Sequence, residues 1–218
     1  HNIVYVEPHH GFESVGGYDY LKEIIRQDFI KLLQKPELAT KYGVTIPRGF
    51  CLYGPPGTGK TWFALALAKE VNLPMLKLAP ADFLRGIVGE TESQTRRLIN
   101  IIESLSPVVV FIDEADQLMM RRGAAVVTDS GVRRGLQSAL LDWLGDKARK
   151  AFIIAATNLV EEMDPAFMRP GRLDKTLLIL QPNEAAREEI LRIHTSVIRK
   201  VPLCKDVDLK ILATATDA

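Results

Sequence analysis

The sequence predicts an α/β fold in which a five-stranded parallel sheet is flanked by helices. Short apolar runs alternate with longer segments of helical periodicity, as expected for successive strand–helix–strand crossovers. A glycine-rich stretch, residues 54–61, stands between one apolar run and a helix. A second apolar run, residues 108–112, ends directly at the acidic pair Asp113 and Glu114.

The predicted strands are short, apolar and rich in β-branched or aromatic residues. They cover residues 50–53, 74–78, 108–112, 152–156 and 176–179. Helical periodicity predicts helices over residues 19–35, 62–71, 91–105, 131–144, 184–200 and 206–213. The sequence QPN at residues 181–183 favours a hinge. We therefore expect an N-terminal linker (residues 1–13), a large α/β domain (residues 14–181) and the start of a small helical lid (residues 182–218).

Composition limits the classes of function. The 218 residues are 47% hydrophobic, which suffices for one domain with a full core and a small appendage. A net charge of +1 argues against bulk binding to nucleic acid or to an anionic membrane. The longest apolar runs fall short of the roughly 20 residues of a membrane span. Two cysteines far apart in the chain favour a reduced, intracellular protein, expected in the cytoplasm, with the nucleus or an organelle as alternatives. The first residue is His1 rather than Met, so we expect a fragment.

Residues 54–61 have the sequence GPPGTGKT, which fits the phosphate-loop pattern GxxxxGK[ST]. The glycines allow a tight loop whose backbone N–H groups face phosphate oxygens, and the following helix directs its N-terminus at the same anion. Lys60 is predicted to reach the β- and γ-phosphates, and Thr61 to ligate Mg²⁺. The pattern therefore predicts a nucleoside triphosphate site.

Asp113 and Glu114 follow a buried strand, which delivers them to the carboxyl edge of the sheet, beside the phosphate loop. Asp113 is predicted to hold Mg²⁺, directly or through water, and Glu114 to orient and deprotonate the attacking water. Taken alone, the pair could simply cap the next helix. Together with a phosphate loop, it indicates hydrolysis.

Three further polar residues are candidates for the same chemistry. Asn158 follows the strand at residues 152–156 and is placed to sense the γ-phosphate, although an isolated Asn is more often a turn residue. Arg169 and Arg172 carry guanidinium groups that stabilise charge on a transferred phosphoryl group. Their position beyond the sensor strand favours action on a site between subunits. The alternative is a solvated charged loop.

These motifs together resemble the AAA ATPase family, in the branch that contains archaeal and eukaryotic unfoldases and the proteasome-activating nucleotidase. The resemblance runs from residue 12 to residue 218. It rests on FESVGG (residues 12–17), KPEL (35–38), YG (42–43), AATN (155–158), DPA (164–166) and RPGRLD (169–174). The last of these motifs is the most specific.

The resemblance implies site roles. Asn158 becomes the first sensor, and Arg169 and Arg172 become arginine fingers that act on the ATP of the neighbouring subunit. The family pattern places Gly16, Ile190 and His194 at the adenine, although a helical histidine is otherwise more often a packing residue. The expected nucleotide contacts are Gly16, Pro56, Gly57, Thr58, Gly59, Lys60, Thr61, Trp62, Asp113, Ile190 and His194, with Mg²⁺ on Thr61 and Asp113.

The sequence departs from the family pattern in three places. The pore loop RGIVGE (residues 85–90) has Ile87 and Val88 where an aromatic residue usually grips polypeptide. The signalling turn after the long helix reads WLG (residues 143–145) instead of an Asp-Gly-Phe-like sequence. The chain is also expected to stop before the second sensor motif. The arginine pairs at 96–97, 121–122 and 133–134 are expected to be solvated or intersubunit ion pairs, with a basic pore lining as the alternative.

The function that these patterns favour is ATP-driven remodelling or unfolding of protein substrates by a homo-oligomeric ring, expected to be a hexamer. An ATP-regulated scaffold that hardly translocates is the main alternative, because the pore residue is not aromatic. A DNA-directed loader is the weaker alternative, since the balanced charge does not favour nucleic acid.

Overall fold

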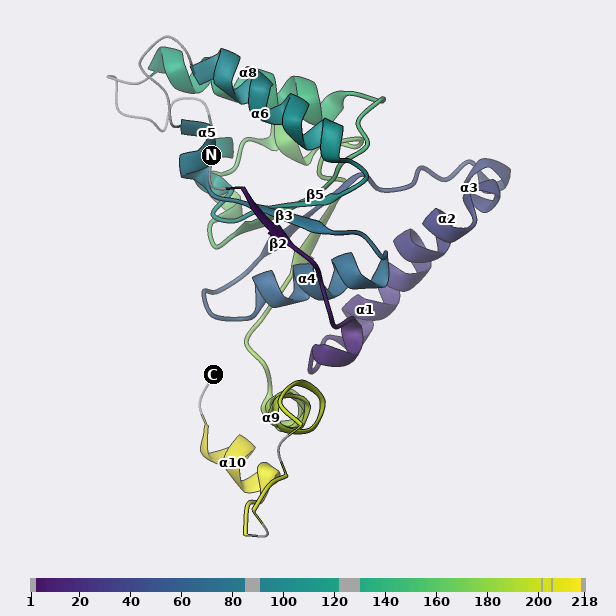
Figure 1. Cartoon of the computed structure of the whole chain (residues 1–218), viewed down its shortest axis with the longest axis vertical. Helices are drawn as coiled ribbons and strands as arrows, with labels where there is room; N and C mark the ends of the chain where they lie inside the picture. Colours follow the sequence, from purple (N-terminus) through teal and green to yellow (C-terminus); the bar gives the residue numbers. More distant parts are fainter. Residues whose placement is uncertain (1–2, 85–90, 122–129, 201, 205, 217–218) are drawn as a thin grey trace. The chain divides into compact units, whose positions relative to one another are not determined.

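The computed structural model describes residues 3–84, 91–121, 130–200, 202–204 and 206–216 (Figure 1). The chain divides into two compact units. The first, here the sheet unit, comprises His1–Glu7, Pro47–Gly54 and Leu73–Leu178. The second, here the loop unit, comprises Pro8–Ile46, Pro55–Asn72 and Ile179–Ala218.

The sheet unit is built on a six-stranded sheet, counted over the described residues, in the order β1-β3-β4-β5-β2-β6. Its strands are β1 (Val4–Val6), β2 (Gly49–Tyr53), β3 (Met75–Leu78), β4 (Val109–Ile112), β5 (Phe152–Thr157) and β6 (Lys175–Leu178). The five predicted strands are confirmed, and they pair in parallel. Strand β1 was not predicted. It has three residues and pairs antiparallel with β3, a contact between distant segments that leaves no local periodicity.

Helices α5 (Pro80–Leu84), α6 (Thr91–Leu105) and α8 (Ser130–Gly145) belong to the sheet unit, and α6 and α8 lie side by side over the sheet (Figure 1). Every residue of β4 and β5 is buried. The core combines apolar residues of both helices with those of the central strands, among them Leu98, Ile102, Leu136, Leu140, Val110 and Ile153. Because the residues on both faces of β4 and β5 are buried, these central strands are unbroken apolar runs rather than alternating patterns.

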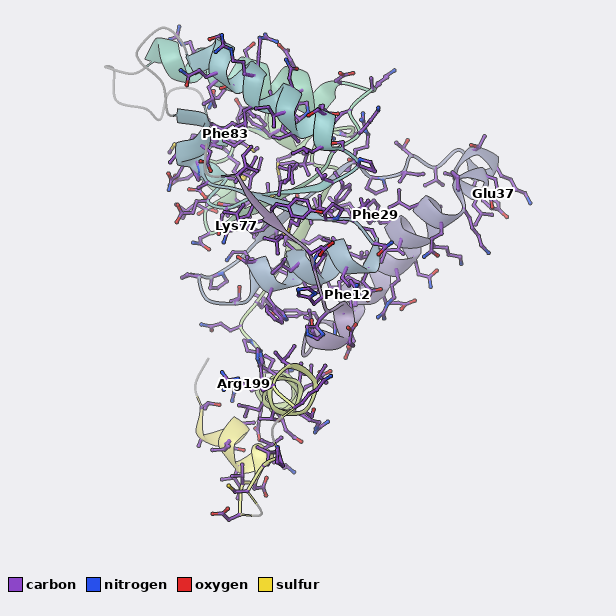
Figure 2. The ribbon with its side chains drawn as sticks, in the orientation of Figure 1. Phe12, Phe29, Glu37, Lys77, Phe83 and Arg199 are labelled. Atoms are coloured by element: carbon purple, nitrogen blue, oxygen red, sulfur yellow. The ribbon has the colours of Figure 1, made fainter. Side chains whose placement is uncertain are left out.

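The loop unit contains the predicted N-terminal helix as a continuous helical run. It consists of α1 (Asp19–Ile25), a π-helical segment (Arg26–Ile30) and α2 (Lys31–Gln34). Pro36 ends this run and begins α3 (Pro36–Tyr42), as proline does at a first helical position. Helix α4 (Lys60–Glu70) follows the phosphate loop. Phe12, labelled beside α4 in Figure 2, packs its ring 5.4 Å from that of Phe63.

The C-terminal part of the loop unit is helical, as predicted. Helix α9 (Glu184–Arg192) continues as a π-helical turn (Ile193–Ile198), and α10 (Leu209–Ala215) packs beside α9 (Figure 1). The side chain of Asn183 accepts the N–H of Ala186, so this residue of the predicted hinge is the N-cap of α9. The domain boundary near residue 182 stays a prediction.

Candidate nucleotide site

Two side chains of the phosphate loop donate hydrogen bonds to the same backbone carbonyl group. The Lys60 ammonium donates to the carbonyl oxygen of Pro55 at 2.7 Å, and the Thr58 hydroxyl donates to the same oxygen at 3.0 Å. Gly57 and Gly59 have φ of 76° and 89°, in the left-handed region where glycine is unstrained. Lys60 and Thr61 begin the 11-residue helix α4, whose first N–H groups have no partner within the helix. A glycine loop opening a helix in this way fits a polyphosphate.

The loop unit also brings together the residues expected at the base of the nucleotide. A Cβ built on Gly16 would lie 2.6 Å from Cγ1 and 2.8 Å from N of Ile190, so a side chain at Gly16 would collide with α9. The Trp62 and His194 rings have centroids 5.8 Å apart. The Trp62 indole N–H donates to the Ser14 carbonyl at 2.8 Å. These contacts join residues that are up to 174 positions apart in the sequence.

A cavity of about 400 Å³ lies beside these contacts, within the size range of small-molecule sites. It is lined by Pro56, Gly57, Thr58, Gln181, Pro182, Arg187, Ile190, Leu191 and Thr216. The sequence did not predict five of these residues as nucleotide contacts: Gln181, Pro182, Arg187, Leu191 and Thr216. Arg187 is held by the carbonyl groups of Ala213 and Pro182, both at 3.0 Å, and no local motif could have predicted these contacts.

The acidic pair and Asn158 lie at one edge of the sheet. Ile112, the last residue of β4, pairs with Ala155, and the Ala115 N–H donates to the Ala156 carbonyl at 2.8 Å. Asp113 and Glu114 therefore emerge beside the end of β5, where Asn158 follows Thr157. Tyr53, the last residue of β2, pairs with Thr157, so the chain enters the phosphate loop at this same carboxyl edge.

The carboxylates of Asp113 and Glu114 each contact a nearby polar side chain. Lys77, labelled in Figure 2, holds its ammonium 3.8 Å from a carboxylate oxygen of Asp113. Glu114 is exposed and has φ of 49°, a left-handed conformation that is uncommon for glutamate. The Gln117 amide donates to a Glu114 carboxylate oxygen at 2.7 Å. A non-glycine residue in this conformation at the end of a central strand is typical of a functional position.

The arginines lie at the opposite edge. They belong to a turn, residues 169–172, in which Gly171 has φ of 88°. The turn precedes β6, and the Arg172 carbonyl lies against Gly49, the first residue of β2. Arg172 donates to the Ala166 carbonyl at 2.6 Å, and its guanidinium lies against Gly145, the last residue of α8. Because β2 has five residues, about 16 Å of strand separates this edge from the entrance of the phosphate loop.

Asp174 fixes the arginine turn. Its two carboxylate oxygens accept the N–H of Gly171 at 2.6 Å and the N–H of Arg48 at 2.7 Å. Bonds between a carboxylate and backbone N–H groups are charge-assisted and therefore strong. In the sequence, Asp174 is only the last residue of the RPGRLD motif, because its contact with Arg48 depends on the pairing of β2 with β6.

Other predicted features fall outside these contacts. Ile87 and Val88 lie outside the described residues. Of the arginine pairs, Arg96 forms an exposed ion pair with Asp142 at 3.5 Å. In the segment WLG, which the resemblance compares with a signalling turn, Trp143 is buried and its indole N–H donates to Glu103 at 2.8 Å. In the part of the chain that the structure describes, no helix has both the length and the apolar character needed to cross a bilayer.

The oxygen donors fit Mg²⁺ rather than a metal held entirely by protein. Mg²⁺ prefers one or two protein oxygens together with phosphates and water, and a hydroxyl such as that of Thr61 and a carboxylate such as that of Asp113 are oxygen donors of this kind. Within the described ranges, no group of three or more His, Cys, Asp or Glu residues is arranged to hold a metal ion.

A mostly parallel sheet, a phosphate loop after β2 and an acidic pair after β4 define the phosphate-loop class of nucleotide-binding domains. The model of the ATPase family associated with various cellular activities (AAA) matches residues 50–180. The chain belongs to this AAA family of ATPases, whose members bind ATP.

Similar curated proteins share a third or more of the aligned residues. The proteasome-activating nucleotidase of Methanothermobacter thermautotrophicus is 38% identical over 97% of this chain and 51% of its own length. Protein SAV of Sulfolobus acidocaldarius is 40% identical over 96% of this chain and 27% of its own. The ATP-dependent zinc metalloprotease FtsH of Acidobacterium capsulatum is 39% identical over 94% of this chain and 32% of its own length. The chain thus spans about half the length of the first relative and less of the others.

Proposed function

We propose that this chain hydrolyses ATP with Mg²⁺ as one subunit of a ring whose sites are shared between neighbours. Lys60 binds the phosphates, Thr61 and Asp113 hold the metal, and Glu114 takes a proton from the attacking water while Asn158 orients it. Bound Mg²⁺ neutralises charge on the phosphates. Gly16, Trp62, Ile190 and His194 surround the base.

One observation carries the shared site. The arginine turn lies at the amino edge of the sheet, while Glu114 and Asn158 lie at the carboxyl edge. Arg169 and Arg172 are therefore poorly placed for the ATP of their own subunit and are presented to a neighbour. A surface that meets a different surface of the next copy generates a closed ring when the rotation closes. Six subunits is the number that the family resemblance implies.

The work that we propose for the ring is protein remodelling or unfolding. Relatives that match nearly the whole chain are named as a proteasome-activating nucleotidase and an ATP-dependent metalloprotease, names that associate this domain with protein turnover. Ile87 and Val88 are the residues that we expect to contact the polypeptide. A scaffolding role remains the alternative, favoured by the aliphatic pore loop.

The test begins with two substitutions that should fail differently. Lys60→Ala should lose affinity for a fluorescent ATP analogue, whereas Glu114→Gln should bind it normally and hydrolyse it very slowly. Equal loss of binding in both variants would remove Glu114 from the role of base.

Adding an unfolded protein or DNA to the wild-type chain then separates the functions. Stimulation of ATPase activity by unfolded protein supports remodelling, stimulation by DNA supports a loader, and no stimulation by either supports a scaffold.

A further inference from the structure

Tyr18 has an unusual backbone conformation just before α1. Its φ of 60° and ψ of 25° lie in the left-handed region, directly after Gly17 with φ of 73°. A bulky residue in this region is an outlier, and such a conformation persists only where the surroundings impose it. We therefore expect the contacts of the Tyr18 side chain to stabilise this backbone conformation.

The Tyr18 side chain contacts three separate segments. Its ring meets the Phe63 ring of α4 edge-on, with centroids 6.1 Å apart and planes at 84°. Its hydroxyl lies 3.2 Å from the Thr58 carbonyl oxygen in the phosphate loop and 2.5 Å from the Leu180 carbonyl oxygen before α9. A phenol has one hydrogen, so the bond is three-centred, shorter to the Leu180 oxygen and longer to the Thr58 oxygen. Burial raises the pKa of Tyr18, so the hydroxyl stays protonated and able to donate at neutral pH.

The contact with Thr58 sets the direction of a phosphate-facing group. The Thr58 carbonyl and the Gly59 N–H belong to one planar trans peptide and therefore point in opposite directions. Rotation of this peptide changes ψ of Thr58 and φ of Gly59, and glycine tolerates either sign of φ, so the peptide can rotate unless something holds it. A rotated peptide would turn a carbonyl oxygen, rather than an N–H, toward a bound anion.

We propose that Tyr18 is a positioning residue that holds the Thr58–Gly59 peptide with its N–H directed to the nucleotide phosphates. The inference rests on the proposed function, in which this loop binds ATP. Because the hydroxyl also contacts Leu180, the orientation of the loop is linked to the segment that leads into the lid helix α9.

The experiment compares two removals of a tyrosine hydroxyl in the 218-residue chain. Tyr18→Phe removes the hydroxyl and keeps the ring contact with Phe63. Tyr20→Phe is the matched control, since Tyr20 is 82% exposed two residues away. Affinities for ATP, ADP and adenosine are measured for each protein by isothermal titration. Loss of one hydrogen bond should weaken ATP and ADP binding by about three- to tenfold in Tyr18→Phe. Adenosine, which has no phosphate, should bind the variant as it binds the wild type.

The ratio of ATP to adenosine affinity within one variant is unaffected by a fraction of unfolded chain, so the test survives a loss of stability. Unchanged ATP affinity in Tyr18→Phe would overturn the inference and leave the proposed function intact. An equal loss for adenosine would also overturn it, because Tyr18 would then act on the whole pocket. A wild-type chain that binds adenosine but neither ATP nor ADP would refute the proposed function together with the inference.

Discussion

The hydroxyl of Thr157 donates to a carboxylate oxygen of Asp116 at 2.5 Å, and its oxygen accepts the N–H of Leu159 at 2.9 Å. Thr157 is 2% exposed, at the end of β5. These two bonds hold Thr157 and Leu159, the neighbours in sequence of Asn158, the proposed sensor. The bond to Asp116 connects this segment to α7 (Asp116–Met119), the helix that follows Glu114. The orientation of the sensor is thereby linked to that of the proposed base.

Thr157→Val should lower kcat for ATP hydrolysis by about tenfold with little change in KM. Valine keeps the shape but removes a hydrogen bond to a charged group, and a loss of about 1.4 kcal/mol in the transition state corresponds to that factor. Thr157→Ser, which keeps the hydroxyl, is the control and should retain most of the activity. Steady-state kinetics test the prediction, and a wild-type kcat in Thr157→Val would contradict it.

Arg172→Ala and Arg169→Ala should leave the ATP affinity of the isolated subunit nearly intact, because the arginine turn lies at the edge of the sheet opposite Asn158. Hydrolysis should fall by roughly 10³-fold, as it does when an arginine finger is lost elsewhere. Mixing Arg172→Ala with Lys60→Ala subunits should restore part of the activity, since each subunit supplies what the other lacks. Absence of rescue at every ratio, in rings shown to be mixed, would argue against a shared site.

Arg149→Met should stabilise the fold. Arg149 is 6% exposed, and among the described residues its Nε and one terminal nitrogen have no hydrogen-bond partner. Burial, and secondarily the charge of Arg48, lowers the pKa of Arg149 to about 10. The folded chain therefore holds this proton less tightly than the unfolded chain, so the charge costs stability at pH 7, and the cost declines only above about pH 10.

Removing that buried charge should raise the free energy of unfolding by roughly 1–2 kcal/mol, which thermal or urea unfolding measures. Lys150→Met, at the exposed neighbouring position, is the matched control and should change it little. A clear loss of stability in Arg149→Met would mean that the Arg149 bond to the Arg48 carbonyl, at 3.1 Å, outweighs the burial of the charge.

Only one of the two cysteines should react in the native protein. Cys51 is buried in β2, and burial, with a contribution from the Asp116 carboxylate, raises the pKa of its thiol to about 12, whereas Cys204 is exposed. At pH 8 a thiol-specific reagent should therefore label one cysteine in the folded chain and two in urea. Cys204→Ser should show no labelling when folded, and rapid labelling of that variant would contradict the burial of Cys51.

The same raised pKa predicts the sign of an effect on stability. The folded chain keeps the Cys51 proton where the unfolded chain loses it, so this contribution is complete below about pH 9 and declines as the pH rises toward 12. Cys51→Ala should flatten the loss of stability in this range when unfolding is followed as a function of pH. An unchanged slope would exclude Cys51 as a source of the pH dependence.

Local pattern was enough to predict the five parallel strands, the phosphate loop and the acidic pair. Residues 54–61 and 108–114 carry their information in spacing and periodicity, and parallel strands bring their carboxyl ends to one edge whatever the remainder of the chain does. The roles of Asn158, Arg169 and Arg172 needed the family resemblance, because an isolated Asn or Arg in a loop has no distinctive local pattern.

Tertiary structure alone placed β1 beside β3, the arginine turn beside Gly49 and the Tyr18 hydroxyl between Thr58 and Leu180. Each of these contacts joins segments that are 40 to 162 positions apart, as the hydroxyl of Tyr18 illustrates. Such pairings are selected by packing and hydrogen bonding across the whole fold, and neither periodicity nor spacing within a segment contains that information. Local motifs in the sequence therefore predict the chemical groups of the site, whereas the contacts that orient those groups form only when the chain is folded.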